Sequence, residues 1–524
     1  MPEVPPLAPG APYDVVIVGA GINGASAAQH LAAAGYRILL VERHDFGSGS
    51  SSRSSRLLHC GLRYLAPGRS ILDFLWHPSR LASAMRIARL AMQARSEFVR
   101  TSGERARSLR FCFPIFKDGP YRSWQVDLAF SLLRKLGPSD LPLDYRRLSR
   151  EEAAQVPLLR ELRDFDKLHS VATFREYQLD WPERICVDMV LDAERLGATV
   201  VNYTTARLAA RSSEGWTVEL RSSTGPDSSV IKVQARSVLN MAGIWIDEVN
   251  RAAEPRARRR ILGTKGCHIV VKLPPECAEY GIATLNSLQE PFYCIPWRGY
   301  HYFGPTETPY DGDKDDISVT HQERLWLLAE ANRLLPSLAL KESDVLMSWA
   351  GVRPLTFDEN VPFGNRARII HDLAADGMPN VLAMTAGPVM SHRSAGRELV
   401  RALARHVSPS SKAAAPDYTP RRFPENQNSP ALLADDGRVK LSDLGHAARQ
   451  EHGRSLMDIL FRRVGIGWDC SLSDDEVKRA AEAIGRELGW DGGRQLQEAA
   501  DFKAEVARLF SPEPGLRPLG AGRP

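Results

Sequence analysis

The sequence has no closely spaced pair of cysteines. Its seven cysteines are scattered singly over 524 residues, so a CxxC motif is absent. This absence excludes a zinc ribbon and a thioredoxin-like redox site, because both need such pairs. An odd number of widely separated cysteines instead favours reduced thiols in the cytoplasm.

Long apolar runs are also missing from the sequence. We find no stretch of about 18 consecutive apolar residues and therefore expect no transmembrane helix. The opening MPEVPPLAPGAP is rich in proline and lacks the apolar core of a signal peptide. We expect residues 1–12 to form a disordered leader.

The charged residues show no large excess of one sign. The chain has 68 Lys and Arg against 63 Asp and Glu, which gives a formal net charge of +5. This small imbalance argues against a nucleic-acid-binding protein. The length predicts more than one domain, because single hydrophobic cores stop growing well below this size.

What the sequence does contain is a nucleotide-binding pattern near its start. The apolar run YDVVIV at 13–18 leads into GAGING, an alanine-rich segment and a second apolar run that ends at Glu42. This order of strand, glycine turn, helix, strand and acid is the dinucleotide-binding fingerprint. We expect Gly19, Gly21 and Gly24 to let the backbone approach a pyrophosphate at the helix N-terminus. Glu42 is expected to accept hydrogen bonds from the ribose hydroxyls.

The fingerprint alone does not choose between NAD and FAD. Its place at the very start of a long chain favours FAD, and so does the late TAG turn at 385–387. A flavin dinucleotide is long, and two separated chain segments usually close around it.

A second unusual stretch is SSRSSRLLHCGLRYL at 51–65, which combines serines and arginines without acidic residues. We predict two anion sites here, one for cofactor phosphates and one for a phosphorylated substrate. Ser51, Ser52 and Ser55 would supply short hydrogen-bond donors to the cofactor phosphates.

The same stretch carries a family resemblance. SSSRSSRLLHCGLRYL resembles the T-S-S-x-S-S-K-L-I-H-G-G-L-R-Y-L motif of the FAD-dependent glycerol-3-phosphate dehydrogenases. Later segments are similar to motifs of that family in the same order, and the resemblance spans roughly 13–510. These segments are NMAGIW, LGTKGCHIVV, YCIPWRGYHYFGPTET, SWAGVRPL and LFRRVGIGW.

The resemblance implies an α/β fold with three parts. These are a Rossmann-like FAD-binding domain, an inserted antiparallel-sheet substrate domain and a C-terminal helical domain. We place FAD-binding parts at about 13–80, 165–265 and 345–407, substrate parts at about 81–164 and 266–344, a linker at 408–430 and the helical domain at 431–510.

The resemblance also implies an activity and a set of site residues. The activity is oxidation of sn-glycerol 3-phosphate to dihydroxyacetone phosphate, with electrons passed to quinone and without a metal. His268, in KGCH, is the candidate base for the hydroxyl proton, and His59 is the second candidate. Lys265 would hold negative charge near the flavin, while Gly243 and Gly387 would border the cofactor. The substrate phosphate would be bound by Arg63, Tyr64, Arg353 and Arg368, and Arg366 competes with Arg368 for this role.

The sequence departs from the family at its late G-G-K-L-T-T-Y-R motif. Here the chain reads AGPVMSHR, and Pro388 occupies the lysine position. A cation near the flavin and the substrate is therefore missing. Either Arg393, His392 or Arg366 compensates for it, or the substrate differs.

Several alternatives remain open from the sequence. The chain is either a related flavoenzyme acting on another polyol phosphate, such as erythritol phosphate, or on an amine or amino acid, or a flavin-binding protein without turnover. The arginine-rich stretch 80–110, which we expect to be helical, is either a helix lying on anionic lipid or a solvated basic helix. We expect a cytoplasmic protein, with peripheral contact to the inner face of the cell membrane in the first case. Residues 431–510 form either a cap or a homodimer contact.

Overall fold

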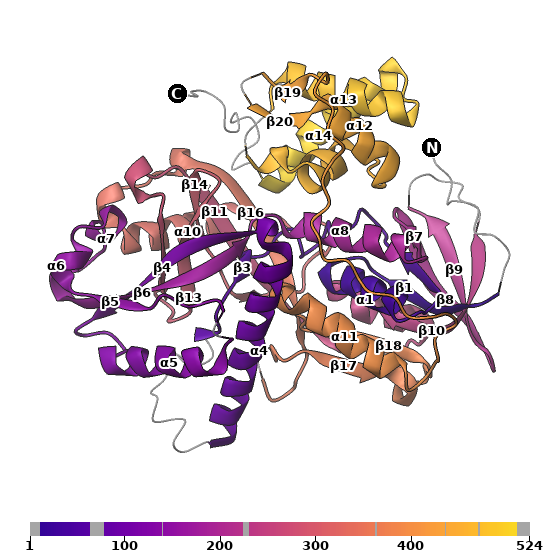
Figure 1. The fold of residues 1–524 in the computed structure, drawn as a ribbon, viewed down its shortest axis with the longest axis horizontal. Coiled ribbons are helices and arrows are strands. Elements are labelled where there is room, and N and C mark those ends of the chain that lie inside the picture. Colours follow the sequence, from indigo (N-terminus) through magenta and orange to yellow (C-terminus); the bar gives the residue numbers. More distant parts are fainter. Residues whose placement is uncertain are drawn as a thin grey trace.

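The computed structural model describes residues 11–62, 78–138, 140–223, 230–361, 364–434, 436–469 and 472–510. Two sheets with their helices lie side by side, and a smaller C-terminal part sits above them (Figure 1). Most of the expected leader 1–12, and the site candidates Arg63 and Tyr64, lie outside the described residues.

The first sheet is built on the predicted fingerprint. Its central strands are parallel and buried, which explains why they read as continuous apolar runs. The sheet order is β17-β18-β10-β1-β2-β7, and β9 pairs with both β10 and β8. Its strands are β1 (Tyr13–Val18), β2 (Ile38–Val41), β7 (Thr199–Val201), β8 (Thr204–Ser212), β9 (Gly215–Ser222), β10 (Ile231–Asn240), β17 (Ile369–Asp372) and β18 (Val381–Thr385).

Alternate residues of the central strands enter two different cores. Val15 and Ile17 of β1 pack against helices α1 (Ile22–Ala33), α8 (Pro182–Arg195) and α11 (His392–Leu403). Val16 and Val18 face the other way, toward β8, β9 and the start of α9 (Ile246–Ala253). The sheet is therefore covered on both faces, as in the predicted Rossmann-like domain.

The second sheet is mostly antiparallel and forms the inserted part of the fold. Its order is β15-β11-β14-β13-β12-β4-β6-β3, with β16 paired to β11 and β5 to β6. Its strands are β3 (Leu57–Leu58), β4 (Ala106–Phe116), β5 (Arg146–Leu148), β6 (Leu168–Leu179), β11 (Ile261–Val271), β12 (Tyr280–Leu285), β13 (Pro291–Trp297), β14 (Tyr300–Gly304), β15 (Thr308–Pro309) and β16 (Val345–Thr356).

The helices of this part cover both faces of the second sheet. Helices α4 (Pro78–Ser102) and α5 (Ser123–Leu136) pack on one face. Helices α6 (Arg150–Ala153), α7 (Pro157–Arg160) and α10 (His321–Leu334) pack on the other.

The structure moves three of the expected boundaries. Strands β6 and β16 belong to the second sheet, although we placed their residues in the FAD-binding part. A strand that is buried on both faces is an apolar run in either sheet. The sequence therefore does not show which strands it pairs with. The basic helix is also shorter than expected, since α4 ends at Ser102 and β4 follows a glycine at 103.

The C-terminal part begins after a long connection without helix or strand, as predicted for 408–430. This segment runs beside the end of α1, where the Ser411 and Ala414 amides donate to the carbonyls of Gly35 and Ala33. The part beyond it is mainly helical, with one short hairpin that we did not expect. Its elements are β19 (Ala431–Leu433), β20 (Asp436–Lys440), α12 (Leu441–Gln450), α13 (Asp474–Leu488) and α14 (Gly492–Phe510).

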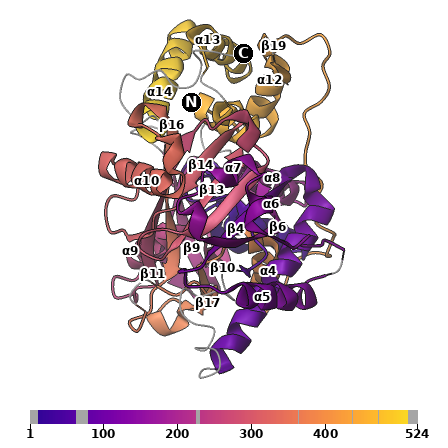
Figure 2. The same cartoon turned by 90° about the vertical axis from the view of Figure 1, so that its left-hand side faces the viewer.

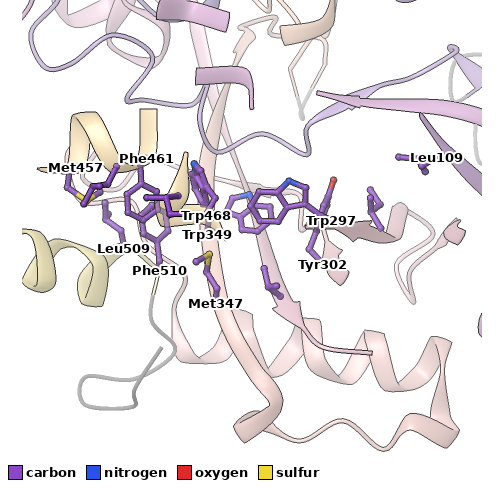
Figure 3. Close-up of a cluster of buried hydrophobic side chains, with 14 of the residues drawn as sticks. Leu109, Trp297, Tyr302, Met347, Trp349, Met457, Phe461, Trp468, Leu509 and Phe510 are labelled. Atoms are coloured by element: carbon purple, nitrogen blue, oxygen red, sulfur yellow. The ribbon is translucent and has the colours of Figure 1, made fainter. Parts of the chain in front are cut away.

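The C-terminal part shares a hydrophobic core with the second sheet. Phe461, Trp468 and Phe510 pack in one buried cluster with Trp297 and Trp349 (Figure 3). In the turned view the C-terminal helices cover the end of the molecule above β14 and β16 (Figure 2). We call residues 431–510 the cap because they pack over this end of the second sheet, and a homodimer contact stays a prediction.

Candidate active site

A deep cavity of about 900 Å³ lies where the two sheets and the C-terminal cap meet. The glycine turn after β1, the serine-rich segment before β3, the facing strands β11 and β16 and the turn after β18 all line it. Five segments that are far apart in the sequence therefore line one site.

The glycine turn has the shape that a dinucleotide requires. Gly19 has a φ of +101°, and a Cβ on Gly24 would lie 1.9 Å from the Gly19 carbonyl oxygen. Only glycine fits at these positions, so the backbone stays open to a ligand at the start of α1. Gly21 is the N-cap of that helix, and the Ser51 hydroxyl accepts from the Ile22 amide at 2.9 Å.

Glu42 lies at the end of β2 and borders the cavity. Its carboxylate accepts from the amides of Ala20 at 2.7 Å and His44 at 3.0 Å. Burial raises the pKa of Glu42, and these two amide donors oppose that shift. The side chain is thus held in place at the edge of the cavity.

The predicted cofactor residues on the other segments also line the cavity. These are Ser51, Ser52, Ser55, Gly243 and Gly387. Asn23 donates to the Gly387 carbonyl at 2.7 Å, which joins the late turn to the start of α1. A Cβ on Gly387 would lie 2.4 Å from the Asn23 amide nitrogen, so the Asn23 side chain would have to shift to admit one. Ser55 differs from the others because its hydroxyl lies 3.1 Å from Nε2 of His268.

His268 and Arg353 stand on one face of the paired strands β11 and β16. His268 lies opposite Trp349, and Arg353 lies opposite Thr264. Between them Gly266 faces Gly351, so two glycines form a flat floor beside both functional side chains. A Cβ on Gly266 would come within 2.6 Å of the Arg353 guanidinium. The absence of a side chain at Gly266 therefore leaves room for the Arg353 guanidinium on the same face as His268.

Burial lowers the pKa of His268 well below the ordinary histidine range. The positive charges of Arg353 and Arg56 act in the same direction. The ring is therefore neutral at physiological pH, which is the form that accepts a proton. His59, the second candidate, also borders the cavity.

The structure does not bring Lys265 or Arg368 to the cavity. The Lys265 ammonium pairs with Glu323 at 2.7 Å, on the α10 side of β11. The Arg368 guanidinium is held by Glu398, with Nε to Oε2 at 3.0 Å, and by Ser391 and Ser394. Both cations are satisfied by protein partners that lie far away in the sequence, so neither is directed at a ligand.

Of the residues that could compensate for the lost lysine, Arg366 reaches the cavity. It borders the cavity with Pro388 and forms an ion pair with Glu307. Arg393 instead donates to Ser102 at 2.7 Å and stacks over the Tyr418 ring at 4.1 Å. His392 is buried, with Nδ1 at 2.8 Å from the Val389 carbonyl. Of the three compensating residues considered, only Arg366 lies at the site.

The sequence reasoning missed Arg56, which anchors the serine segment beneath the site. Its guanidinium lies 4.4 Å from the Trp468 ring centroid and 4.6 Å from that of Trp297. It donates to the Ser52 carbonyl at 3.0 Å and lies 3.6 Å from Glu183. Its place in the serine-rich motif was a signal, but its partners come from three other parts of the chain.

The cap also contributes lining residues that we did not predict. They come from the π-helical turn Asp458–Arg463 with the residue before it, from the 3-10 turn Ile466–Trp468, and from the end of α14. The lining residues of the cap include Met457, Asp458, Phe461, Arg462, Trp468, Glu505, Arg508, Leu509 and Phe510.

Comparisons with known proteins agree with this geometry. A family profile described as FAD dependent oxidoreductase matches residues 14–402. The chain is 30% identical to a glycerol-3-phosphate dehydrogenase of Synechocystis over 403 residues, which cover 74% of this chain and 69% of that protein. It is 26% identical to an aerobic glycerol-3-phosphate dehydrogenase of Staphylococcus haemolyticus over 90% of this chain and 78% of that protein.

Solved structures show the same fold. The glycerol-3-phosphate dehydrogenase of Bacillus halodurans complexed with FAD superposes with a TM-score of 0.68 at 19% identity and covers 95% of both chains. The L-alpha-glycerophosphate oxidase of Mycoplasma pneumoniae with FAD bound gives a TM-score of 0.57 at 18% identity, over 80% of this chain and 100% of that one.

The chain belongs to the family of FAD-dependent oxidoreductases, and within that family it is of the glycerol-3-phosphate dehydrogenase type. The predictions of the fold class and of FAD are thereby confirmed. The glycine turn, Glu42 and the late turn at Gly387 fit the dinucleotide, which supplies the hydride acceptor when it is bound.

Proposed function

We propose that this chain oxidises the secondary alcohol of a phosphorylated polyol, with sn-glycerol 3-phosphate going to dihydroxyacetone phosphate. The observation that carries the proposal is the placement of Arg353 and His268 on one wall of the cavity, beside a floor of two glycines. An arginine can bind a phosphate, and a neutral histidine is a group that can take up the alcohol proton.

Arg366 takes the role that we first considered for Arg368 in this proposal. Its guanidinium borders the cavity, and a bound phosphate would compete with Glu307 for it. Arg63 and Tyr64 remain predicted phosphate ligands. Electrons would leave to a quinone, and a homodimer and a cytoplasmic location remain predictions.

Pro388 favours one second candidate, a polyol phosphate longer than glycerol phosphate. This short ring borders the cavity where the resemblance places a lysine, so it leaves more room there. A panel of sn-glycerol 3-phosphate, erythritol 4-phosphate, glycerol and glycine, assayed with a soluble quinone analogue, separates the cases. We expect turnover with the two phosphates only. Turnover of glycerol or glycine that is faster than turnover of the two phosphates would contradict phosphate recognition.

We further propose peripheral membrane contact through α4, and the exposure of its arginines decides which of them can test it. The described residues contain no helix with the length and apolarity to cross a bilayer. Arg86 and Arg89 are exposed on α4, and Trp124 is 59% exposed on α5. Arg95, in contrast, is buried and donates to the Leu141 carbonyl. A change at Arg95 would test folding and not lipid binding.

We therefore expect the double variant Arg86→Glu, Arg89→Glu to lose binding to anionic vesicles in a co-sedimentation assay. Each arginine near an anionic surface contributes about 1 kcal/mol, so the double reversal should weaken binding by more than tenfold. Neutral vesicles and high salt serve as controls. Equal sedimentation of the variant and the wild type would remove α4 from any lipid-binding surface.

A further inference from the structure

The ring of His268 is closed off from the cavity that it borders. Only 1% of the residue is exposed. Trp349 stacks on the ring with the ring centroids 4.9 Å apart and the planes at 20°, and Tyr302 makes a T-shaped contact with centroids 5.6 Å apart. A Cβ on Gly304 would come within 2.7 Å of the ring carbon Cδ2, so this neighbour also fits tightly. The ring therefore has one fixed position and little surface for a substrate to touch.

The two ring nitrogens differ in what they can reach. Nδ1 is buried, and no group within the described residues hydrogen-bonds to it. Nε2 lies 3.1 Å from the hydroxyl of Ser55. Ser55 is half-buried and borders the cavity. The polar group that a substrate can meet at this point is therefore the serine hydroxyl, with the histidine behind it.

We propose that Ser55 relays the proton of the substrate hydroxyl to Nε2 of His268. This inference rests on the proposed function. The O–H bond of the substrate breaks and its proton goes to Oγ of Ser55, while the Ser55 proton goes to Nε2. The substrate carbon–oxygen bond becomes a carbonyl, and the carbon-bound hydrogen leaves with two electrons as hydride to the oxidised flavin.

The backbone of Ser55 is held well enough for this role. The Tyr302 hydroxyl donates to the Ser55 carbonyl at 2.7 Å, and Gln178 donates to the Tyr302 hydroxyl at 3.1 Å. The next residue, Arg56, is caged by Trp297 and Trp468. Supports of this kind fix a short side chain within hydrogen-bond reach of its acceptor.

The charges around the ring link the relay to the substrate. The neutral His268 ring has a nitrogen lone pair that can accept a proton. Arg353 disfavours the charged ring that forms when the proton is accepted. A substrate phosphate bound at Arg353 would offset that positive charge and so make the histidine a better base when substrate is present. Neutral alcohols would lack this effect.

The first test is the rate of flavin reduction by sn-glycerol 3-phosphate in stopped flow. We expect Ser55→Ala to lower the rate by about 100-fold or more with little change in substrate affinity. Ser55→Thr, which keeps the hydroxyl, should retain most of the rate. A wild-type rate in Ser55→Ala would overturn the inference.

A second test does not depend on the substrate. In ¹⁵N-histidine-labelled holoenzyme, the Nε2 signal that disappears in His268→Gln identifies His268. We expect this signal to shift in Ser55→Ala and to return in Ser55→Thr, because the hydrogen bond is lost and restored. An unchanged Nε2 signal in Ser55→Ala overturns the inference. A failure of the proposed function would instead appear as wild-type flavin that no polyol phosphate reduces.

Discussion

Replacing Arg353 with alanine should lower kcat/KM for sn-glycerol 3-phosphate, mostly through a higher KM. The expected loss of transition-state stabilisation is about 2–4 kcal/mol. Arg353 shares one wall of the cavity with His268 and lies over the glycine floor. A phosphate bound there would be partly desolvated, so loss of the guanidinium would leave its charge without a partner. Steady-state kinetics of both proteins, each saturated with FAD, give the comparison.

Arg368→Ala is the matched control for this prediction. Arg368 is held by Glu398 and Ser394 away from the cavity, so its loss should affect stability more than KM. If Arg368→Ala raises KM as much as Arg353→Ala does, the assignment of the phosphate site to the β16 wall is contradicted. An unchanged kcat/KM in Arg353→Ala would contradict it directly.

The second large effect is expected where the cap is joined to the cofactor domain. Asp45 follows β2 and accepts from both terminal nitrogens of Arg463, at 2.6 and 2.7 Å, with Arg462 as a further partner. The Asp45 and Arg463 side chains are fully buried. We expect Asp45→Asn to lower the free energy of unfolding by about 3–5 kcal/mol, because the fully buried Arg463 loses its counter-charge and Arg462 loses one of its two. Chemical denaturation of the holoenzyme measures this loss.

An exposed ion pair supplies the control for Asp45. Glu104 pairs with Arg422, and their side chains are 57% and 77% exposed. Glu104→Gln should therefore change stability by no more than about 1 kcal/mol. An equally small effect of Asp45→Asn would show that the buried cluster does not hold the cap in place.

The acid side of the stability curve gives a further test of the same cluster. Burial alone would raise the pKa of Asp45, but Arg463 and Arg462 outweigh it and lower the pKa. The stability from this group is therefore present above the unfolded value of about 4 and is lost as the pH falls below it. We expect wild type to lose more stability than Asp45→Asn between about pH 4 and pH 2. If wild type and Asp45→Asn lose the same amount of stability over this pH range, the acid dependence does not come from Asp45.

The local part of the site could be predicted from the sequence because its geometry is set by neighbouring residues. The spacing of Gly19, Gly21 and Gly24 before an apolar helix fixes the cofactor turn, whatever the rest of the chain does. The partners of isolated side chains could not be predicted in this way. Ser55 meets His268 across 213 positions of sequence, so the motif indicated a phosphate contact and the structure shows a histidine contact.

The arginines illustrate the same limit. The sequence favours Arg368 over its competitor Arg366, but Arg368 is held by Glu398, 30 residues away, while Arg366 borders the cavity. Arg56 is similar, because the tryptophans around it come from β13, β16 and the cap. Long-range packing decides which guanidinium is satisfied by protein and which faces a ligand.

The most direct test of the account is an anaerobic titration of the purified holoenzyme with sn-glycerol 3-phosphate, followed by visible absorption. We predict loss of the oxidised flavin band near ~450 nm, with one flavin reduced per substrate oxidised. Such bleaching would show hydride transfer from a polyol phosphate and tolerance of Pro388 at the lysine position. A flavin band that no polyol phosphate reduces would contradict the proposed function.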